Sequence, residues 1–300
     1  MLLPILLLAA DLRVGIIGTD TSHATAFAQL LNGGKVPGAK IVAAYKGGSP
    51  DVESSRTRVD NYAKELQTKW GVEIVDTIPA LAAKVDAILL LSVDGRAHLP
   101  QFKAALAAKK PVFIDKPLAS TLADAREVDR LAKEAHVPWF SASSLRYSEI
   151  VSSVEGPGIL GAMTWGPGPF EEHHQLDLSW YAVHPVEILF TLMGPGCEEV
   201  TRISGANADE ISCKWQDGRI GTVRALRPYG TYGAVVFRKD GVAVSPPKAH
   251  TDYEGLVREI VKFFETGKPP VSNADTLEIF AFMDAAQRSK EAGGKPMRLK

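Results

Sequence analysis

The 300-residue sequence has little net charge, few cysteines and no apolar segment long enough to cross a membrane. Its 34 basic and 35 acidic residues leave a formal charge of −1, so no long-range field gathers nucleic acid or an anionic membrane surface. The two cysteines, Cys197 and Cys213, are too few for a zinc site or a disulfide framework. We expect both to be buried apolar residues, and a single bridge between them stays open. A composition of 45% hydrophobic and 23% charged residues indicates a globular protein with a small-molecule partner.

Residues 1–10 are almost wholly apolar and are followed at once by the charged Asp11 and Arg13. They are too short for a transmembrane helix, which needs about 20 residues, and resemble the hydrophobic part of a secretory signal peptide. No basic residue precedes them, and Leu8-Ala9-Ala10 is only a fair cleavage site. We predict export to the periplasm or the cell exterior. The alternative is an apolar extension of the first strand in a cytoplasmic protein.

Strand-like and helical segments alternate over residues 11–142. The predicted strands are 13–18, 40–45, 72–75, 85–91, 111–117 and 137–141. The predicted helices are 23–31, 54–70, 78–84, 99–109 and 122–135. Near-continuous apolar strands joined by helices require a parallel sheet covered on both faces. The segment therefore predicts an α/β, doubly wound domain of the Rossmann type that binds a dinucleotide.

After Ser143, strand-like segments follow one another without intervening helices. They are 199–205, 210–216, 220–226, 232–238 and 242–245, with turn signals at Asp217-Gly218 and Asp240-Gly241. Helices are predicted at 178–193, 253–266 and 276–292. Residues 143–300 thus predict an α+β domain with a largely antiparallel sheet. We expect this domain to bind the substrate and to pair with a second copy of itself in a homo-oligomer.

The apolar run 111–114 ends abruptly in Asp115-Lys116-Pro117. Ligands of open α/β sheets bind beyond the carboxyl ends of the strands, so the Lys116 ammonium is predicted to meet a bound substrate. The alternative is a surface lysine that closes a strand.

The glycine fingerprint of dinucleotide-binding folds, G-x-G-x-x-G, is nearly absent. Gly18-Thr19-Asp20-Thr21-Ser22-His23 keeps only the first glycine. Asp20 brings negative charge toward a diphosphate unless its side chain caps the following helix. The sequence thus weakens cofactor binding, and the alternative is a fold that holds its ligand differently or not at all.

Polar residues also end the neighbouring strands. Lys46 follows the second strand, where an acid would meet the adenosine ribose, and either contacts the 2′-phosphate of NADP or is solvated. The loop from Ser92 to His98 brings Asp94, Arg96 and His98 toward the crevice, where Arg96 and His98 are candidates for anion binding. Asp94 alternatively only caps the next helix.

The densest polar cluster comprises Glu171, Glu172, His173, His174, Asp177, Trp180, Tyr181, His184 and Glu187. His184 and Glu187 are three residues apart on one helical face, the spacing of an oriented base, although a histidine in an apolar helix is more often a satisfied core residue. His173 and His174 point to opposite sides of an extended segment. A metal site is therefore the weaker interpretation, and none is predicted.

These motifs, in this order, resemble the Gfo/Idh/MocA oxidoreductases, the glucose–fructose oxidoreductase and inositol dehydrogenase family. The resemblance rests on Val14 to Gly18, the loop ending at His98, Asp115-Lys116-Pro117 in place of Glu-Lys-Pro, Ser144 to Tyr147 in place of Asn-x-Arg-Phe, and His184. It implies that Lys116 and His184 are catalytic, Lys116 touching the nicotinamide ribose and the substrate hydroxyl and His184 taking the hydroxyl proton. It implies NAD or NADP as cofactor and a carbohydrate or polyol as substrate. The cofactor-binding residues it suggests are Gly18, Thr19, Asp20, Ser22, His23, Lys46, Ser92, Asp94, His98, Asp115 and Lys116. The substrate-binding residues it suggests are Arg146, His174, Trp180 and Tyr181.

The sequence departs from the family at three positions. Asp20 and His23 replace the second and third glycines, and Trp180 stands where many members have an aspartate four residues before the histidine. Two alternatives follow from these departures. One is a non-catalytic sugar-binding or regulatory protein of the same fold, and the other is a redox-assisted glycosidase or epimerase that holds NAD tightly.

Overall fold

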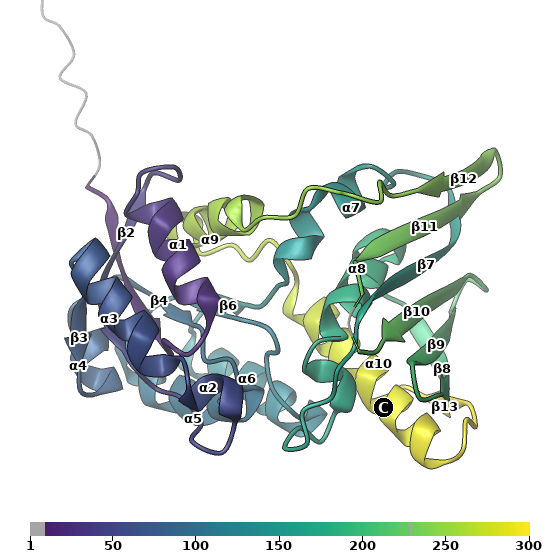
Figure 1. Ribbon diagram of the computed structural model, residues 1–300, viewed down its shortest axis with the longest axis horizontal. Helices are drawn as coiled ribbons and strands as arrows, with labels where there is room; N and C mark the ends of the chain where they lie inside the picture. The colour runs from purple at the N-terminus through teal and green to yellow at the C-terminus, as the bar shows by residue number, and fades with distance from the viewer. Residues whose placement is uncertain (1–9, 229) are drawn as a thin grey trace, which may run out of the picture.

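The computed structural model describes residues 10–228 and 230–300. Figure 1 shows two sheets on opposite sides of the molecule, with α-helices around the first sheet and between the two. The predicted leader falls almost wholly on residues 1–9, outside the described residues. Within the described ranges, no helix is long and apolar enough to cross a membrane.

The first sheet has six parallel strands in the order β3-β2-β1-β4-β5-β6. Its strands are β1 (Leu12–Ile17), β2 (Ala39–Tyr45), β3 (Glu73–Val75), β4 (Ala87–Leu90), β5 (Val112–Ile114) and β6 (Trp139–Phe140). Its helices are α1 (Ser22–Leu31), α2 (Glu53–Arg56), α3 (Val59–Trp70), α4 (Ile78–Ala82), α5 (Gly95–Ala105), the 3-10 turn η1 (Leu106–Ala108) and α6 (Leu122–Ala135). The predicted doubly wound sheet is confirmed. Strand order reverses between β1 and β4, where such sheets open a ligand crevice.

The helix predicted over 54–70 is interrupted: α2 ends at Arg56 and α3 begins at Val59. The side chain of Ser55 explains the interruption, because its Oγ donates to Asp20 and accepts from the Ser49 N–H. A serine hydroxyl that bonds outside the helix competes with the helical backbone pattern. The turn is thereby held against the β1–α1 loop.

The second sheet has seven strands in the order β12-β11-β7-β10-β9-β8-β13. They are β7 (Ile159–Pro167), β8 (Cys197–Ser204), β9 (Ala208–Trp215), β10 (Ile220–Leu226), β11 (Gly233–Arg238), β12 (Gly241–Val244) and β13 (Met297–Arg298). All pairs are antiparallel except β7 with β10, so the predicted, largely antiparallel sheet is confirmed.

Sequence analysis missed β7, the third strand of this order. The glycines of β7 resemble turn residues, so the sequence does not indicate a strand. Two of them are needed because neighbouring atoms leave no room for a Cβ. A Cβ on Gly161 would lie 2.7 Å from the Ile220 carbonyl oxygen, and one on Gly166 would lie 2.4 Å from the Tyr232 ring. Glycine in a strand interior often marks such a close approach.

The remaining helices join the two sheets. They are the 3-10 turn η2 (Ser144–Tyr147), α7 (Glu149–Ser152), the 3-10 turn η3 (Asp177–Ser179), α8 (Val183–Met193), α9 (Glu254–Thr266) and α10 (Asn273–Glu291). Helix α8 packs on β7 and β10, and α10 contacts both α6 and β8. Helix α9 returns to the first sheet, where Leu256 and Phe263 share a core with Val14 and Phe27, and Figure 1 shows it beside α1. The chain leading into α9 is thereby brought to the crevice.

The two cysteines correct the sequence analysis. Cys197 of β8 and Cys213 of β9 are both buried, as expected, but they are joined in a disulfide. The bridge left open by the sequence is the one present, and none of the described cysteines is free.

Candidate active site

A cavity of about 400 Å³ lies where the carboxyl edge of the first sheet meets the second domain. Its wall comes from the start of α1, the α2–α3 turn, the end of β5, η2, the start of α8 and residues 251–253. Six of the residues predicted to be catalytic or to bind cofactor or substrate line it: Ser22, His23, Lys116, Trp180, Tyr181 and His184. Both predicted catalytic residues therefore face one cavity, although they belong to different domains.

Lys116 follows β5 and is half-buried, with its ammonium 5.5 Å from the centre of the Tyr181 ring. Burial is the largest influence on its pKa and lowers it; Asp115 opposes this shift, and the positive charge of Arg58 adds to it. An ammonium with a lowered pKa in a partly dry cavity is a strong hydrogen-bond donor to a developing oxyanion.

Asp115 is buried beside Lys116 and is paired with His23. The His23 Nδ1 lies 2.5 Å from one carboxylate oxygen, and the Lys116 N–H donates to the other at 2.8 Å. Burial alone would raise the pKa of Asp115, but the charge and hydrogen bond of His23, together with Lys116, lower it. In the sequence analysis, His23 was placed near the cofactor only because it replaces the third glycine of the fingerprint. The structure instead makes it the partner of the acid that precedes Lys116.

His184 lies in the first turn of α8 and is 7% exposed. Its Nδ1 is 2.7 Å from Ser143 Oγ, which also accepts from the Leu145 N–H at 3.1 Å. A proton on Nδ1 donated to that hydroxyl leaves the Nε2 lone pair free to accept a proton. Burial first, and then the charges of Lys116 and His23, lower the pKa of His184 well below 6.5. The imidazole is therefore neutral at pH 7, as a general base must be.

Glu187 does not orient His184, contrary to the sequence interpretation. Its carboxylate accepts from the Ser143 N–H at 2.8 Å and from Arg146 Nε at 2.9 Å. Burial raises the pKa of Glu187, and Arg146 and Ser143 oppose that shift. Arg146, predicted to bind substrate, is thus committed to a buried ion pair. Ser143, which the sequence analysis did not single out, connects this pair to His184.

The place where a dinucleotide fold brings its backbone to a diphosphate is filled by Asp20. A Cβ on Gly18 would lie 2.4 Å from the Ser92 nitrogen, so the β1–α1 and β4–α5 loops touch there. The Asp20 carboxylate is fully buried and accepts from Ser55 Oγ at 2.6 Å and from the Val93 N–H at 3.1 Å. Burial raises its pKa, and these two hydrogen bonds oppose the shift. The helix cap suggested for Asp20 is wrong, because Thr21 caps α1.

Several other predicted cofactor residues have structural partners away from the cavity. Lys46 forms an exposed ion pair with Asp60 at 2.8 Å, Ser92 Oγ donates to Gln101, and Thr19 Oγ1 donates to the Val59 carbonyl at 2.9 Å. His98 is buried between the carbonyls of Ser92 and Leu118, and burial lowers its pKa.

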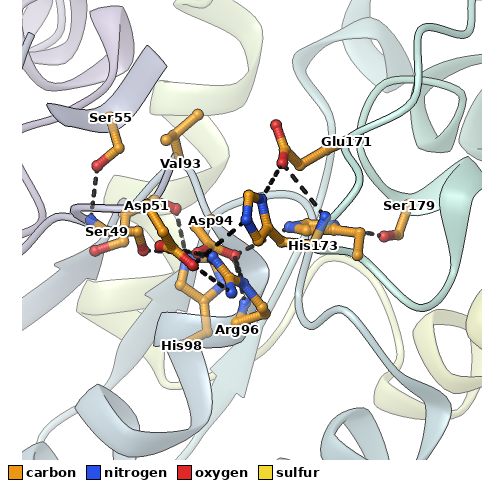
Figure 2. A network of polar contacts seen from close by, with 12 residues as sticks. Ser49, Asp51, Ser55, Val93, Asp94, Arg96, His98, Glu171, His173 and Ser179 are labelled. Atoms are coloured by element: carbon orange, nitrogen blue, oxygen red, sulfur yellow. Dashed lines mark hydrogen bonds and ion pairs between the residues drawn. The ribbon is translucent and has the colours of Figure 1, made fainter. Parts of the chain in front are cut away.

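A polar network joins the two domains beside the cavity. Figure 2 shows Ser49, Asp51, Asp94 and Arg96 of the first domain facing Glu171, His173 and Ser179 of the second. Asp94 is the centre: it caps α5, accepts from Ser49 Oγ at 2.6 Å and from Arg96, and meets His174 Nε2 at 3.0 Å. Burial would raise the pKa of Asp94, but the hydrogen bonds from His174, Arg96 and Ser49 outweigh it and hold the pKa far below its usual range.

His174 is therefore an interdomain contact. Its Nδ1 meets Ser179 Oγ at 3.0 Å, and its ring lies edge-on to Trp180. His173 pairs with Glu171, and its Nε2 lies 3.7 Å from Asp51, so both histidines face the same interdomain network. The expected opposite directions are wrong, because residues 171–174 form a turn in which the His174 N–H donates to the Glu171 carbonyl. Among the residues that the structure describes, no cluster of three or more His, Cys, Asp or Glu could hold a metal ion.

Comparison with known proteins relates the first domain to a family. Residues 12–143 match the family model described as the Gfo/Idh/MocA oxidoreductase family with an NAD-binding Rossmann fold. The first domain of the chain is thus similar to that of the Gfo/Idh/MocA oxidoreductases. That description agrees with the predicted nicotinamide cofactor and leaves the choice between NAD and NADP open.

Curated relatives match parts of the chain. The inositol 2-dehydrogenase of Acidiphilium cryptum is 36% identical over 120 residues, which is 39% of this chain and 32% of that protein. An uncharacterised oxidoreductase of Escherichia coli is 26% identical over 168 residues, 54% of this chain and 43% of that protein. The matched part spans about a third of the length of three inositol 2-dehydrogenases, including that of Acidiphilium cryptum.

Solved structures resemble the whole fold. GenD2 of gentamicin A biosynthesis, in complex with NAD, superposes with a TM-score of 0.77 at 16% identity over 97% of both chains. The myo-inositol dehydrogenase of Lactobacillus casei, in complex with NAD(H) and myo-inositol, gives a TM-score of 0.74 at 17% identity, again over 97% of both chains. At these identities the likeness establishes the fold.

Proposed function

We propose that the protein is an NAD(P)-dependent oxidoreductase that interconverts a hydroxyl and a carbonyl on a sugar or polyol. The observation that carries this proposal is that Lys116 and His184, contributed by different domains, line one cavity. The family's NAD-binding fold and the inositol 2-dehydrogenase relatives support it.

Different residues of the cavity have different roles in the proposed oxidation of an alcohol. The Nε2 of His184 accepts the hydroxyl proton, and Ser143 Oγ, bonded to Nδ1, stabilises the resulting imidazolium. The Lys116 ammonium stabilises the alkoxide that develops as the proton leaves. A nicotinamide bound among Ser22, His23 and Lys116 would supply the hydride acceptor. Trp180 and Tyr181 add an aromatic wall, a common lining of small-molecule sites.

We also propose a homo-oligomer formed through the second sheet. Large apolar side chains are exposed along it, a pattern that marks interaction surfaces. They are Leu160, Ile203, Ile220, Phe237, Val242 and Val244. Export remains a proposal as well, and the Cys197–Cys213 disulfide agrees with an oxidising compartment.

Turnover tests the proposed activity. Wild type is supplied with NAD or NADP and a panel of sugars and cyclic and linear polyols, and formation of reduced cofactor is followed. We expect turnover with at least one polyol, a drop of about 100-fold or more in kcat/KM for Lys116→Met, and little change for Lys103→Met, an exposed lysine on α5. Cofactor binding without turnover on any compound contradicts the proposal.

A non-catalytic sugar-binding protein is the second candidate, and the filled position of Asp20 favours it. This alternative predicts that sugars raise the melting temperature whereas NAD and NADP do not, because only a ligand of the native state stabilises it.

A further inference from the structure

We infer that Arg58 is a phosphate ligand of the dinucleotide, held in place by the buried contact between Asp20 and Ser55. The inference rests on the proposed function and concerns the part of the cofactor site where this chain departs from its family. It assigns the anion-binding role of the missing glycines to a side chain of the α2–α3 turn.

The usual approach to the diphosphate is closed in this chain. The Asp20 carboxylate already accepts the Val93 N–H and the Ser55 hydroxyl between the two loops. It is itself an anion, so a phosphate placed beside it would be repelled and would find those donors taken. A diphosphate must therefore lie farther out along α1.

The cavity begins directly beyond Asp20. Thr21 and Ser22, at the start of the ten-residue helix α1, line the same cavity as Lys116, and so do Ser54 and Arg58. The amino terminus of a helix favours an anion through its dipole, and here the His23 N–H already donates to the Thr21 cap. The cavity thus offers a continuous path from the helix start to the predicted nicotinamide position.

The guanidinium of Arg58 also favours an anion in this cavity, in addition to the start of α1. Its Nε donates to the Ser54 carbonyl, so both terminal nitrogens of the guanidinium can still donate to a ligand. No carboxylate of the described residues forms an ion pair with Arg58. Among the described residues that line the cavity, Asp252 is the only acid, and its carboxylate is bonded to His250 and to the Glu254 N–H. Arg58 and Lys116 therefore give the cavity a positive field that matches a phosphate.

The contact between Asp20 and Ser55 explains how Arg58 reaches the cavity. Ser55 belongs to α2, and its hydroxyl is fixed by Asp20 on one side and by the Ser49 N–H on the other. Three residues later, Arg58 precedes α3. Asp20 thereby becomes a positioning residue: the side chain that closes the glycine approach also anchors the turn that carries the replacement cation.

Calorimetric binding of NADH and NADPH to the full protein tests the inference. We expect Arg58→Ala to weaken the better-bound cofactor by about 10- to 100-fold, the usual effect of losing a charge-assisted hydrogen bond. Arg56→Ala is the matched control, since Arg56 is an exposed arginine of the same turn that does not line the cavity. Arg56→Ala should change the cofactor affinity less than twofold. Arg58→Lys should show only part of the loss seen in Arg58→Ala, because lysine keeps the positive charge. A molecule without phosphate, nicotinamide riboside, should bind equally to wild type and Arg58→Ala.

A double-mutant cycle tests the positioning role. Ser55→Ala should weaken cofactor binding when Arg58 is present and should have little effect in the Arg58→Ala background, because it acts through that arginine. A purely structural role for Ser55 would give the same loss in both backgrounds and would overturn this part of the inference.

The outcomes separate the inference from the proposed function. Equal affinities in Arg58→Ala and Arg56→Ala contradict the role of Arg58 and leave the proposed function standing. Absence of NADH and NADPH binding to folded wild type contradicts the proposed function and the inference together.

Discussion

Replacement of His184 by asparagine tests the assignment of the general base. Asparagine keeps a polar group within reach of Ser143 but cannot take a proton from an alcohol. Loss of a general base typically costs 10²- to 10⁴-fold, so kcat/KM should fall by that factor, equivalent to about 3–5 kcal/mol of transition-state stabilisation. His136→Asn is the matched control. His136 is an exposed histidine at φ 55°, a conformation that asparagine tolerates.

The pH dependence of the same variant gives a sharper result. Because the pKa of His184 is lowered below 6.5, kcat/KM of the wild type should stay level down to pH 6.5 and decline only below it, as the imidazole becomes protonated. In His184→Asn this acid limb should disappear.

The free energy of unfolding should also decrease as the pH falls below 6.5. Below pH 6.5 the unfolded chain binds a proton at His184 that the folded protein refuses, so the free energy of unfolding decreases as pH falls in that window. His184→Asn should lose this part of the decrease in the free energy of unfolding.

An acid limb of kcat/KM centred at or above pH 6.5 would refute the assignment of His184 as the general base. So would a His184→Asn variant whose kcat/KM lies within tenfold of the wild-type value.

Two further predictions concern stability. Asp94→Asn leaves the buried His174 and the partly exposed Arg96 without their buried charged partner, and it should lower the free energy of unfolding by about 3–5 kcal/mol in urea titrations. Asp51→Asn, an exposed partner of Arg96, should cost about 1 kcal/mol or less. Replacing both Cys197 and Cys213 by serine should cost about 2–4 kcal/mol under non-reducing conditions, because the bridge closes a loop over a sequence separation of 16, and an unchanged unfolding midpoint would contradict a formed disulfide.

Local sequence was sufficient for the first sheet. Continuous apolar strands, helix caps such as Thr121 before α6, and the abrupt polar end of β5 are encoded within a few residues. The position of Lys116 at the carboxyl edge follows from that pattern and from the parallel order of the strands. The second sheet was predictable where Asp-Gly turns separate its hairpins.

The side-chain partners of the site were not predictable in this way. Asp20 and Ser55 are 35 residues apart, and Asp94 and His174 are 80 apart, so neither contact leaves a local periodic signal. His184 was paired with Glu187 by helical spacing, but Ser143, 41 residues away, is the residue that bonds its ring. Strand β7 was hidden because Gly161 and Gly166 resemble turn residues, although close packing requires them.

Hydride transfer from a labelled substrate would show directly that the cavity oxidises an alcohol. A polyol found to be turned over is supplied with deuterium on its carbinol carbons, together with oxidised cofactor, and the mass of the reduced cofactor is measured. We expect wild type to form reduced cofactor that carries one deuterium, and His184→Asn to form it at least about 100-fold more slowly. Reduced cofactor without deuterium, or a His184→Asn variant that forms it as fast as wild type, would contradict a dehydrogenase site built on Lys116 and His184.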